Sequence, residues 1–440
     1  MLQKDNSCVY LRSEAFDKDF VLVGGRLPVG KEDGIINIAI SGGKIAWMGE
    51  GEIPERFSGA RLIDLSGCVV LPGMMDLHTN LREPGREDEE TILSGAAAAV
   101  AGGFTAIACL PNTEPVTDTE QKVRYIVQQS KDVPCKIYPI GAATKGLQGK
   151  ELAPYYEMQQ AGARGFSDGK HSITDSAMLK SAMNYAKMFD ATYFCNCMDT
   201  DLSRNGLMNE CEISDAMGMH GIPTVAEDID ISRHVFMAGY TKCKLHITRV
   251  SSASSVAIIE KYKDNRITVA VTPHHLCFNH EALADFNTNL KVTPPIRSEE
   301  DRQLLISYLK KGVIDTIVSD HAPHTSEEKD IEFENASFGV SGLETLVGAI
   351  FTELIDKNHI DITDFVRMMC VTPYEILGLR PPRLEVGETA DISVISTERK
   401  WTVSSFYSKC SNSPFLGTEF KGRPVLTVVD GKIVYERFDK

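Results

Sequence analysis

The chain of 440 residues lacks any long hydrophobic run. Its longest apolar stretch, between Gly95 and Pro111, is rich in alanine and glycine and is shorter than the about 20 residues that a membrane-spanning helix needs. The N-terminal segment also lacks the apolar core of a secretory signal, because Lys4, Arg12 and Glu14 interrupt it. We therefore predict a cytoplasmic protein that does not contact a membrane.

Basic residues are scarce, since 46 Lys and Arg stand against 61 Asp and Glu, for a net charge of −15. A nucleic-acid-binding protein needs a basic surface, so we expect no nucleic-acid partner. The 11 cysteines include no Cys-x-x-Cys pair, and Cys195 and Cys197 lie only two positions apart. That spacing is not typical of a structural zinc site, and we expect buried, reduced thiols.

Short apolar runs are present throughout the middle of the chain, and segments with helical periodicity, such as 176–189 and 299–311, lie between them. The predicted strands are 69–78, 104–111, 135–143, 163–169, 191–198, 242–250, 267–276 and 314–323. Strands that alternate with helices pair in parallel, and near-continuous apolar runs are typical of strands buried on both faces. The pattern predicts an α/β fold, with a closed (β/α)8 barrel of the TIM type over residues 71–384.

The two ends of the chain have a different pattern. Residues 19–70 and 385–440 contain short alternating runs joined by glycine turns, such as Gly42-Gly43 and Asp430-Gly431. Such turns are typical of antiparallel hairpins. We predict that residues 1–70 and 385–440 combine into one small β-sandwich domain beside the barrel.

In barrels of this type the active site lies at the C-terminal ends of the strands, and distinctive motifs occur at those positions. They are His78-Thr79-Asn80 followed by Arg82 and Pro84-Gly85, then Pro111-Asn112-Thr113-Glu114-Pro115, Gly165-Phe166-Ser167-Asp168 and Asp320-His321-Ala322-Pro323-His324. Over nearly the whole chain these motifs resemble the cyclic amidohydrolases, and among them the dihydroorotases. The resemblance implies the barrel fold and a hydrolase that opens or closes a cyclic amide.

Active members of that family hold one or two divalent metal ions, usually zinc, on four histidines and two acidic residues. The six corresponding positions here are His78, Asn80, Asp168, Asn196, Arg249 and Asp320. Three potential ligands remain, His78, Asp168 and Asp320, whereas Asn80, Asn196 and Arg249 occupy histidine positions. Cys195 and Cys197 cannot replace Asn196, because side chains alternate along a strand. A guanidinium cannot bind a metal, and we predict that Arg249 instead pairs with Asp168, Asp320 or both.

The resemblance also implies a substrate site. In dihydroorotases an arginine, an asparagine and a histidine hold the substrate carboxylate, and these positions correspond to Arg82, Asn112 and His324. A guanidinium with two polar donors suits a carboxylate, so a small carboxylate is the expected ligand. The catalytic acid/base would be Asp320. We interpret His274 and His275 as structural, and the acidic run 87–90 as a solvated helix start.

Several functions remain open at this point. The leading hypothesis is a dihydroorotase homologue of pyrimidine biosynthesis that is catalytically inactive because three metal-ligand histidines are replaced. The resemblance to inactive homologues of some bacteria implies aspartate carbamoyltransferase, the preceding enzyme, as a partner. One alternative is an active dihydroorotase with a single zinc on His78, Asn80, Asp168 and Asp320. Another is a ligand-binding protein or a different cyclic-amide hydrolase. We expect no cofactor, or zinc if the remnant site is occupied, and a homo-oligomer.

Overall fold

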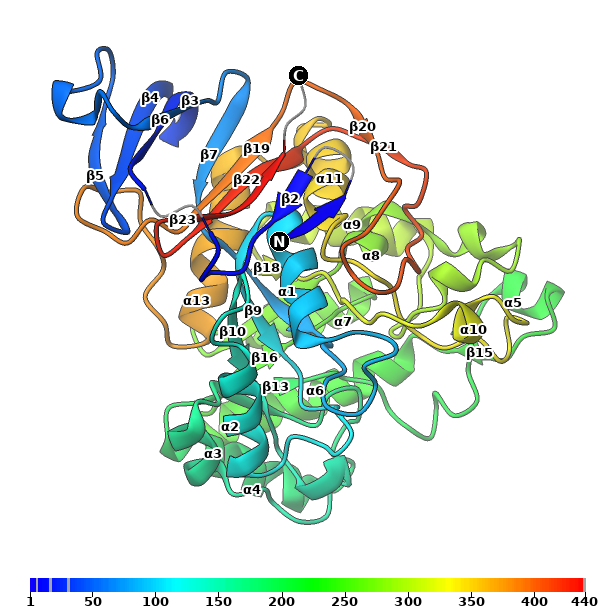
Figure 1. Ribbon diagram of the computed structural model, residues 1–440. Helices are drawn as coiled ribbons and strands as arrows, with labels where there is room; N and C mark the ends of the chain where they lie inside the picture. Colours follow the sequence, from blue (N-terminus) through cyan, green and yellow to red (C-terminus); the bar gives the residue numbers. More distant parts are fainter. Residues whose placement is uncertain (5–6, 16–17, 30–31, 438–440) are drawn as a thin grey trace.

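The computed structural model describes residues 1–4, 7–15, 18–29 and 32–437, which form a barrel beside a second sheet (Figure 1). The barrel strands follow chain order: β8 (Met74–Thr79), β9 (Phe104–Cys109), β10 (Lys136–Pro139), β12 (Gly165–Ser167), β13 (Thr192–Cys195), β16 (Lys244–Ile247), β17 (Ile267–Val271) and β18 (Thr316–Ile317). Neighbouring strands pair in parallel. The short β11 (Gly141–Ala142) continues β10 and pairs with β12, and a parallel bridge from Thr79 to His321 closes the ring. The predicted barrel is confirmed.

Helices surround the barrel. They are α1 (Ile92–Ala101), α2 (Glu120–Gln129), α3 (Tyr155–Ala161), α4 (Ser176–Met188), α5 (Glu212–Ala216), α6 (Val225–Thr241), α7 (Ala253–Tyr262), α8 (Pro273–Cys277), α9 (Glu299–Lys310), α10 (Ser326–Lys329), α11 (Leu346–Ile350), α12 (Ile362–Val366) and α13 (Thr372–Ile376). The helices predicted over 176–189 and 299–311 are confirmed as α4 and α9. Each begins after a side-chain cap: Asp175 accepts from the Ala177 amide and Ser298 accepts from the Asp301 amide.

Both ends of the chain build the second sheet. Its strands are β1 (Leu2–Lys4), β2 (Ser7–Val9), β3 (Phe20–Val29), β4 (Glu32–Ser41), β5 (Lys44–Gly49), β6 (Arg61–Asp64), β7 (Cys68–Pro72), β19 (Ile392–Ser396), β22 (Arg423–Val429) and β23 (Lys432–Arg437). Their order is β1-β2-β23-β22-β19-β7-β3-β4-β5, with β6 on β3. The two ends therefore meet where β7 pairs with β19, as predicted. Residues 5–6, 16–17, 30–31 and 438–440 of the predicted terminal domain lie outside the described residues.

Several predicted strands differ from the structure. The run 135–143 is divided into β10 and β11, and only Thr316–Ile317 of the run 314–323 forms a strand. The run 69–78 is two strands in two sheets, β7 and β8, separated by Gly73, where a Cβ would lie 2.2 Å from the Thr105 hydroxyl oxygen. The run 267–276 ends as a strand at Val271, because Thr272 accepts a hydrogen bond from the His275 amide and Pro273 starts α8. An apolar run alone does not show where the backbone changes direction.

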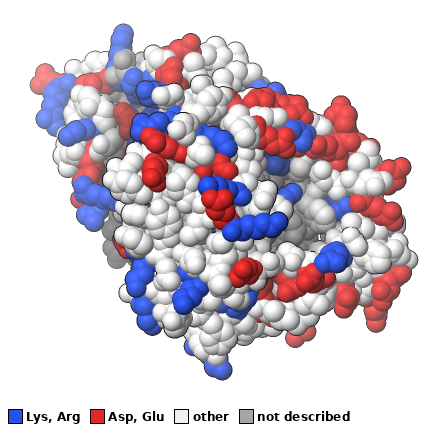
Figure 2. Space-filling model, turned by 90° about the horizontal axis from the view of Figure 1, so that it is seen from below, with Lys and Arg blue, Asp and Glu red and all other residues white. Residues whose placement is uncertain are grey.

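Charged side chains are unevenly spread over the surface. On the face drawn in Figure 2, Asp and Glu gather along one edge, and no continuous basic stripe crosses the residues drawn. No helix within the described ranges is long and apolar enough to cross a membrane.

Candidate active site

The predicted site residues stand at the C-terminal ends of the barrel strands. His78 lies at the end of β8, and Asp168 directly follows β12. Asn196 directly follows β13, Arg249 lies two residues beyond β16, and Asp320 lies three residues beyond β18. Parallel strands therefore bring together side chains that are more than 200 positions apart in the sequence.

A cavity of about 330 Å³ opens at this end of the barrel. The predicted residues that line it are His78, Asn80, Arg82, Asn112, Arg249, Asp320 and His324. Lys170, Thr293 and the segment from Asn335 to Gly339 also line the cavity, and the sequence analysis did not identify them. Lys170 lies two residues beyond Asp168, the last residue of the strand motif, and this position could have indicated its role. The segment 335–339 contains no motif that could have done so.

Arg249 forms an ion pair with Asp320 at the expected metal site. Its Nη1 donates to Asp320 Oδ1, and His78 Nε2 lies 3.3 Å from that same oxygen. All three side chains are buried. Burial raises the pKa of Asp320, whereas the Arg249 guanidinium opposes this shift. Burial, together with the nearby guanidinium of Arg249, holds the pKa of His78 well below its usual range, so His78 is neutral. The predicted pairing of Arg249 is confirmed for Asp320.

The other three positions of the expected metal site have different partners, and Asn80 Nδ2 donates to the His321 carbonyl at 2.9 Å. Both Asp168 carboxylate oxygens accept hydrogen bonds from Thr144, one from its amide at 2.8 Å and one from its hydroxyl at 2.6 Å. Asn196 Nδ2 donates to the Lys170 carbonyl at 3.2 Å. Neither Asp168 nor Asn196 lines the cavity. The structure thus gathers Arg249, Asp320 and His78 but leaves Asp168 and Asn196 apart from them.

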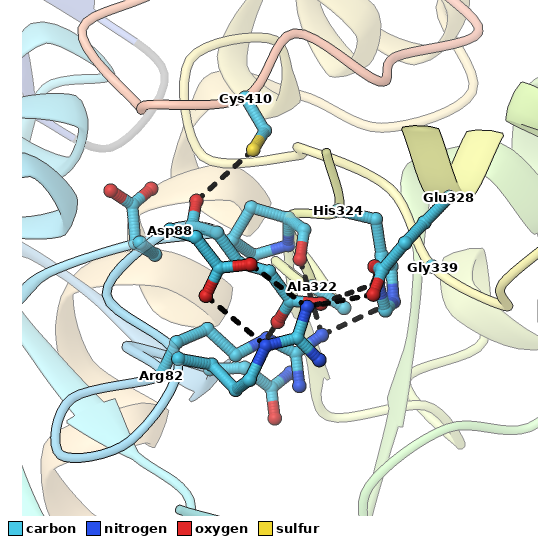
Figure 3. A network of polar contacts seen from close by, with 12 residues as sticks. Arg82, Asp88, Ala322, His324, Glu328, Gly339 and Cys410 are labelled. Atoms are coloured by element: carbon cyan, nitrogen blue, oxygen red, sulfur yellow. Dashed lines mark hydrogen bonds and ion pairs between the residues drawn. The ribbon is translucent and has the colours of Figure 1, made fainter. Parts of the chain in front are cut away.

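Arg82 is paired with a buried carboxylate (Figure 3). Its Nε lies 2.6 Å from Glu89 Oε2, and its Nη2 lies 3.2 Å from His324 Nε2. His324 Nδ1 lies 2.9 Å from Glu89 Oε1 and 2.6 Å from Glu328 Oε2. Arg86 contacts both acids and completes the network. Two of the three residues expected to hold a substrate carboxylate therefore already have carboxylate partners within the chain.

The interpretation of residues 87–90 as a solvated helix start is wrong for half of the run. Glu89 and Glu90 are 1% and 0% exposed. Glu90 accepts from Ser408 and lies 3.2 Å from His321 Nε2, just as Glu89 serves Arg82 and His324. Buried basic side chains need a partner of opposite charge. The nearby motifs that contain arginine and histidine could therefore have predicted that Glu89 and Glu90 are buried partners.

Arg82 and Asp320 share an unusual backbone conformation. Their φ angles are +58° and +52°, in the left-handed region that side chains other than glycine seldom adopt. Such conformations cost about 1–3 kcal/mol and cluster at functional sites. Both Arg82 and Asp320 line the cavity with their charged side chains.

His274 and His275 are both buried. His275 is held by Thr272 at Nδ1 and by the Pro294 carbonyl at Nε2. His274 Nε2 lies 3.8 Å from Asp320 Oδ2. His275 therefore has a purely structural environment, while His274 borders the Arg249–Asp320 pair.

Comparison with known proteins places this geometry in a family. The family model described as "Dihydro-orotase-like" matches residues 67–255. A protein of Syntrophus aciditrophicus named dihydroorotase is 42% identical over 425 residues, which cover 94% of this chain and 99% of that protein. Another dihydroorotase, of Acetivibrio thermocellus, is 39% identical over 421 residues, covering 94% and 98%.

Solved structures show the same fold at lower identity. The L-hydantoinase (dihydropyrimidinase) of Arthrobacter aurescens superposes with a TM-score of 0.84 at 24% identity, covering 96% of this chain and 97% of its own. The dihydropyrimidinase of Brevibacillus agri gives a TM-score of 0.81 at 20% identity, with 95% of each chain covered. Sequence similarity over the full length and the barrel with its terminal sheet lead to one conclusion: this chain belongs to the dihydroorotase family of cyclic amidohydrolases.

Proposed function

We propose that this chain is a non-catalytic dihydroorotase homologue of pyrimidine biosynthesis that supports aspartate carbamoyltransferase. The observation that carries the first half is the ion pair between Arg249 and Asp320. In the family Asp320 would bind the metal and move the proton. Here its Oδ1 is bound to a guanidinium, which keeps its charge at any pH at which the protein is folded.

The residues present do not fit a divalent metal ion. Zinc favours imidazole, thiolate and carboxylate ligands. At the six family positions, Asn80 and Asn196 use their amide nitrogens as donors to the carbonyls of His321 and Lys170. Arg249 adds a positive charge beside Asp320, which repels a second cation. We therefore derive no metal-dependent step for this chain.

The Arg82 network supports the same proposal. A substrate carboxylate would have to displace Glu89 from Arg82 and His324 before it could bind. Glu89 is 1% exposed and lies in place without any binding cost, whereas a ligand loses translational freedom on binding. The site is therefore expected to bind carbamoyl aspartate or dihydroorotate weakly.

One alternative has an observation in its favour. His78 Nδ1 and Asn196 Oδ1 are buried and have no hydrogen-bond partner among the described residues. The free His78 nitrogen favours the second candidate, an active enzyme with a single zinc on His78, Asn80, Asp168 and Asp320. Elemental analysis separates the two. We expect less than about one tenth of a zinc per chain that depends on His78, since lost ligands cost more than the about 10–100-fold of an outer-shell change. Stoichiometric zinc that disappears in His78→Ala would support the alternative.

The proposed partner is aspartate carbamoyltransferase, which the family resemblance suggests. The outer face of α6 offers a surface for this partner. The side chains exposed there are Val225, Ile229, Phe236 and Tyr240, which are between 46% and 71% exposed. Their spacing of four, seven and four residues places them on one side of the helix. Co-expression with aspartate carbamoyltransferase of the same cell, followed by size-exclusion chromatography with light scattering, should give a complex. Separate elution well above micromolar concentration, with unchanged transferase activity, would contradict this part of the proposal.

A further inference from the structure

A second group of potential metal ligands lies away from the cavity. Cys195 is the last residue of β13, Cys197 follows two positions later, and His234 lies in the middle of α6. The two sulfur atoms are 3.3 Å apart, and one ring nitrogen of His234 lies within 4.8 Å of both. The three side chains are 4%, 0% and 0% exposed. They pack in the core between the barrel and its helices, on the side of β13 opposite to Asn196.

His234 is oriented by Asp230. Its Nδ1 lies 2.9 Å from the Asp230 carbonyl oxygen and 3.4 Å from Asp230 Oδ1. The other nitrogen, Nε2, is buried and has no hydrogen-bond partner in the described part of the chain. A buried nitrogen left in this state costs about 1–3 kcal/mol, so its position beside two sulfur atoms needs an explanation.

Asp230 is itself fixed in place. Its Oδ1 accepts from Arg233 at 2.5 Å, and its Oδ2 accepts from the Met198 amide at 3.0 Å. A histidine that is oriented by a backbone carbonyl or a carboxylate at one ring nitrogen, and whose other nitrogen faces a ligand, is common at metal sites. The Asp230 carbonyl orients His234 in this way.

The donor set selects the class of metal. Two thiolates and an imidazole are soft donors, which favour copper(I) and zinc. Structural zinc requires four ligands, and among the described residues the cluster contains three. Copper(I) accepts three soft ligands in a dry, apolar site. We propose that Cys195, Cys197 and His234 form a buried, three-coordinate copper(I) site.

The test uses the full-length protein, purified under reducing, oxygen-free conditions and titrated with copper(I) in the presence of a competing chelator. We expect one copper(I) per chain with an ultraviolet sulfur-to-copper charge-transfer band. Cys195→Ser and Cys197→Ser should each weaken binding more than 100-fold, since loss of a ligand exceeds the about 10–100-fold of an outer-shell change. Cys370→Ser, at another buried cysteine, should leave binding unchanged.

X-ray absorption at the copper edge keeps the proposal testable if a variant does not fold. The wild-type copper form should show two sulfur neighbours and one nitrogen neighbour. Sulfur neighbours alone, copper binding that survives both serine variants, binding of zinc in preference to copper, or a Cys195–Cys197 disulfide in the reduced preparation would each overturn it. None of these results depends on activity at the barrel cavity, so the proposed function stands or falls separately.

Discussion

At the scale of single residues, the central feature is the buried ion pair between Arg249 and Asp320. Arg249 and Asp320 are 5% and 2% exposed. Burying either charge alone is costly, and the pair compensates both. The sequence predicted this pair because an arginine and a carboxylate at neighbouring strand ends of a barrel both need a partner of opposite charge.

Removal of Arg249 should therefore destabilise the protein. We expect Arg249→Ala to lower the free energy of unfolding by about 3–5 kcal/mol, because Asp320 then stays buried without its partner. Chemical denaturation measures the change. Arg367→Ala removes one side of the exposed ion pair with Asp364, at 3.6 Å, and should cost less than about 1 kcal/mol. Equal effects of the two substitutions would show that the buried pair is not what holds the cavity.

Restoring the lost histidines should return zinc before it returns turnover. The triple variant Asn80→His, Asn196→His, Arg249→His supplies the missing ligands, but catalysis also needs positioning to about 0.5 Å. Elemental analysis and a dihydroorotase assay of the same sample separate the two properties. Single reversions should change little, and full activity of Arg249→His alone would refute the account of a site changed at several positions.

Glu89 should weaken the binding of a carboxylate ligand in the cavity, because it already pairs with Arg82 and His324. Glu89→Gln keeps the shape of the side chain but removes the charge that occupies Arg82 and His324. We expect carbamoyl aspartate to raise the melting temperature of this variant more than that of the wild type, since ligand binding to the folded state stabilises it. Glu87→Gln, at an exposed position, is the matched control. An unchanged ligand effect in Glu89→Gln would mean that Arg82 is not the carboxylate site.

The sequence did not predict the role of Glu89. An acidic residue near a helix start is most often solvated, because the helix dipole favours it there. Only the folded barrel brings Glu89 against His324, which is 235 positions away in the chain. Local pattern carries no information on such a contact.

At the scale of elements, strand positions were predictable and strand ends were not. Apolar runs located all of the barrel strands, because strands buried on both faces need continuous apolar sequence. They did not show that Gly73 separates two sheets or that Thr272 and Pro273 begin α8, because both changes depend on single-residue geometry.

Helix α6 is the element to which we assign the partner contact. Phe236 and Tyr240 are 56% and 71% exposed on its outer face, and aromatic side chains of this kind contribute strongly to protein interfaces. We expect Phe236→Ser with Tyr240→Ser to lower co-elution with aspartate carbamoyltransferase at least tenfold. Leu304→Ser on α9, 41% exposed, should have no effect. Association of the wild type with itself, lost in the same double variant, would instead assign α6 to a homo-oligomer interface.

At the scale of the whole molecule, the chain has the family's barrel and a second sheet built from both termini. Relatives named dihydroorotase match 94% of the chain. The fold could be predicted because a barrel needs a buried apolar run for each strand. The family could be predicted because its motifs follow several of these strands. Whether a member of the family is active cannot be predicted from that pattern, since a few polar side chains decide it.

The most direct test of the account is the rate at which the purified chain interconverts carbamoyl aspartate and dihydroorotate in the presence of added zinc. We expect no turnover above that of a His78→Ala, Asp320→Ala double variant. Arg249 is ion-paired with Asp320, and we propose that the histidines that bind metal in active members are replaced. Zinc-dependent turnover that is lost in the double variant would contradict the central claim and establish the chain as a working dihydroorotase.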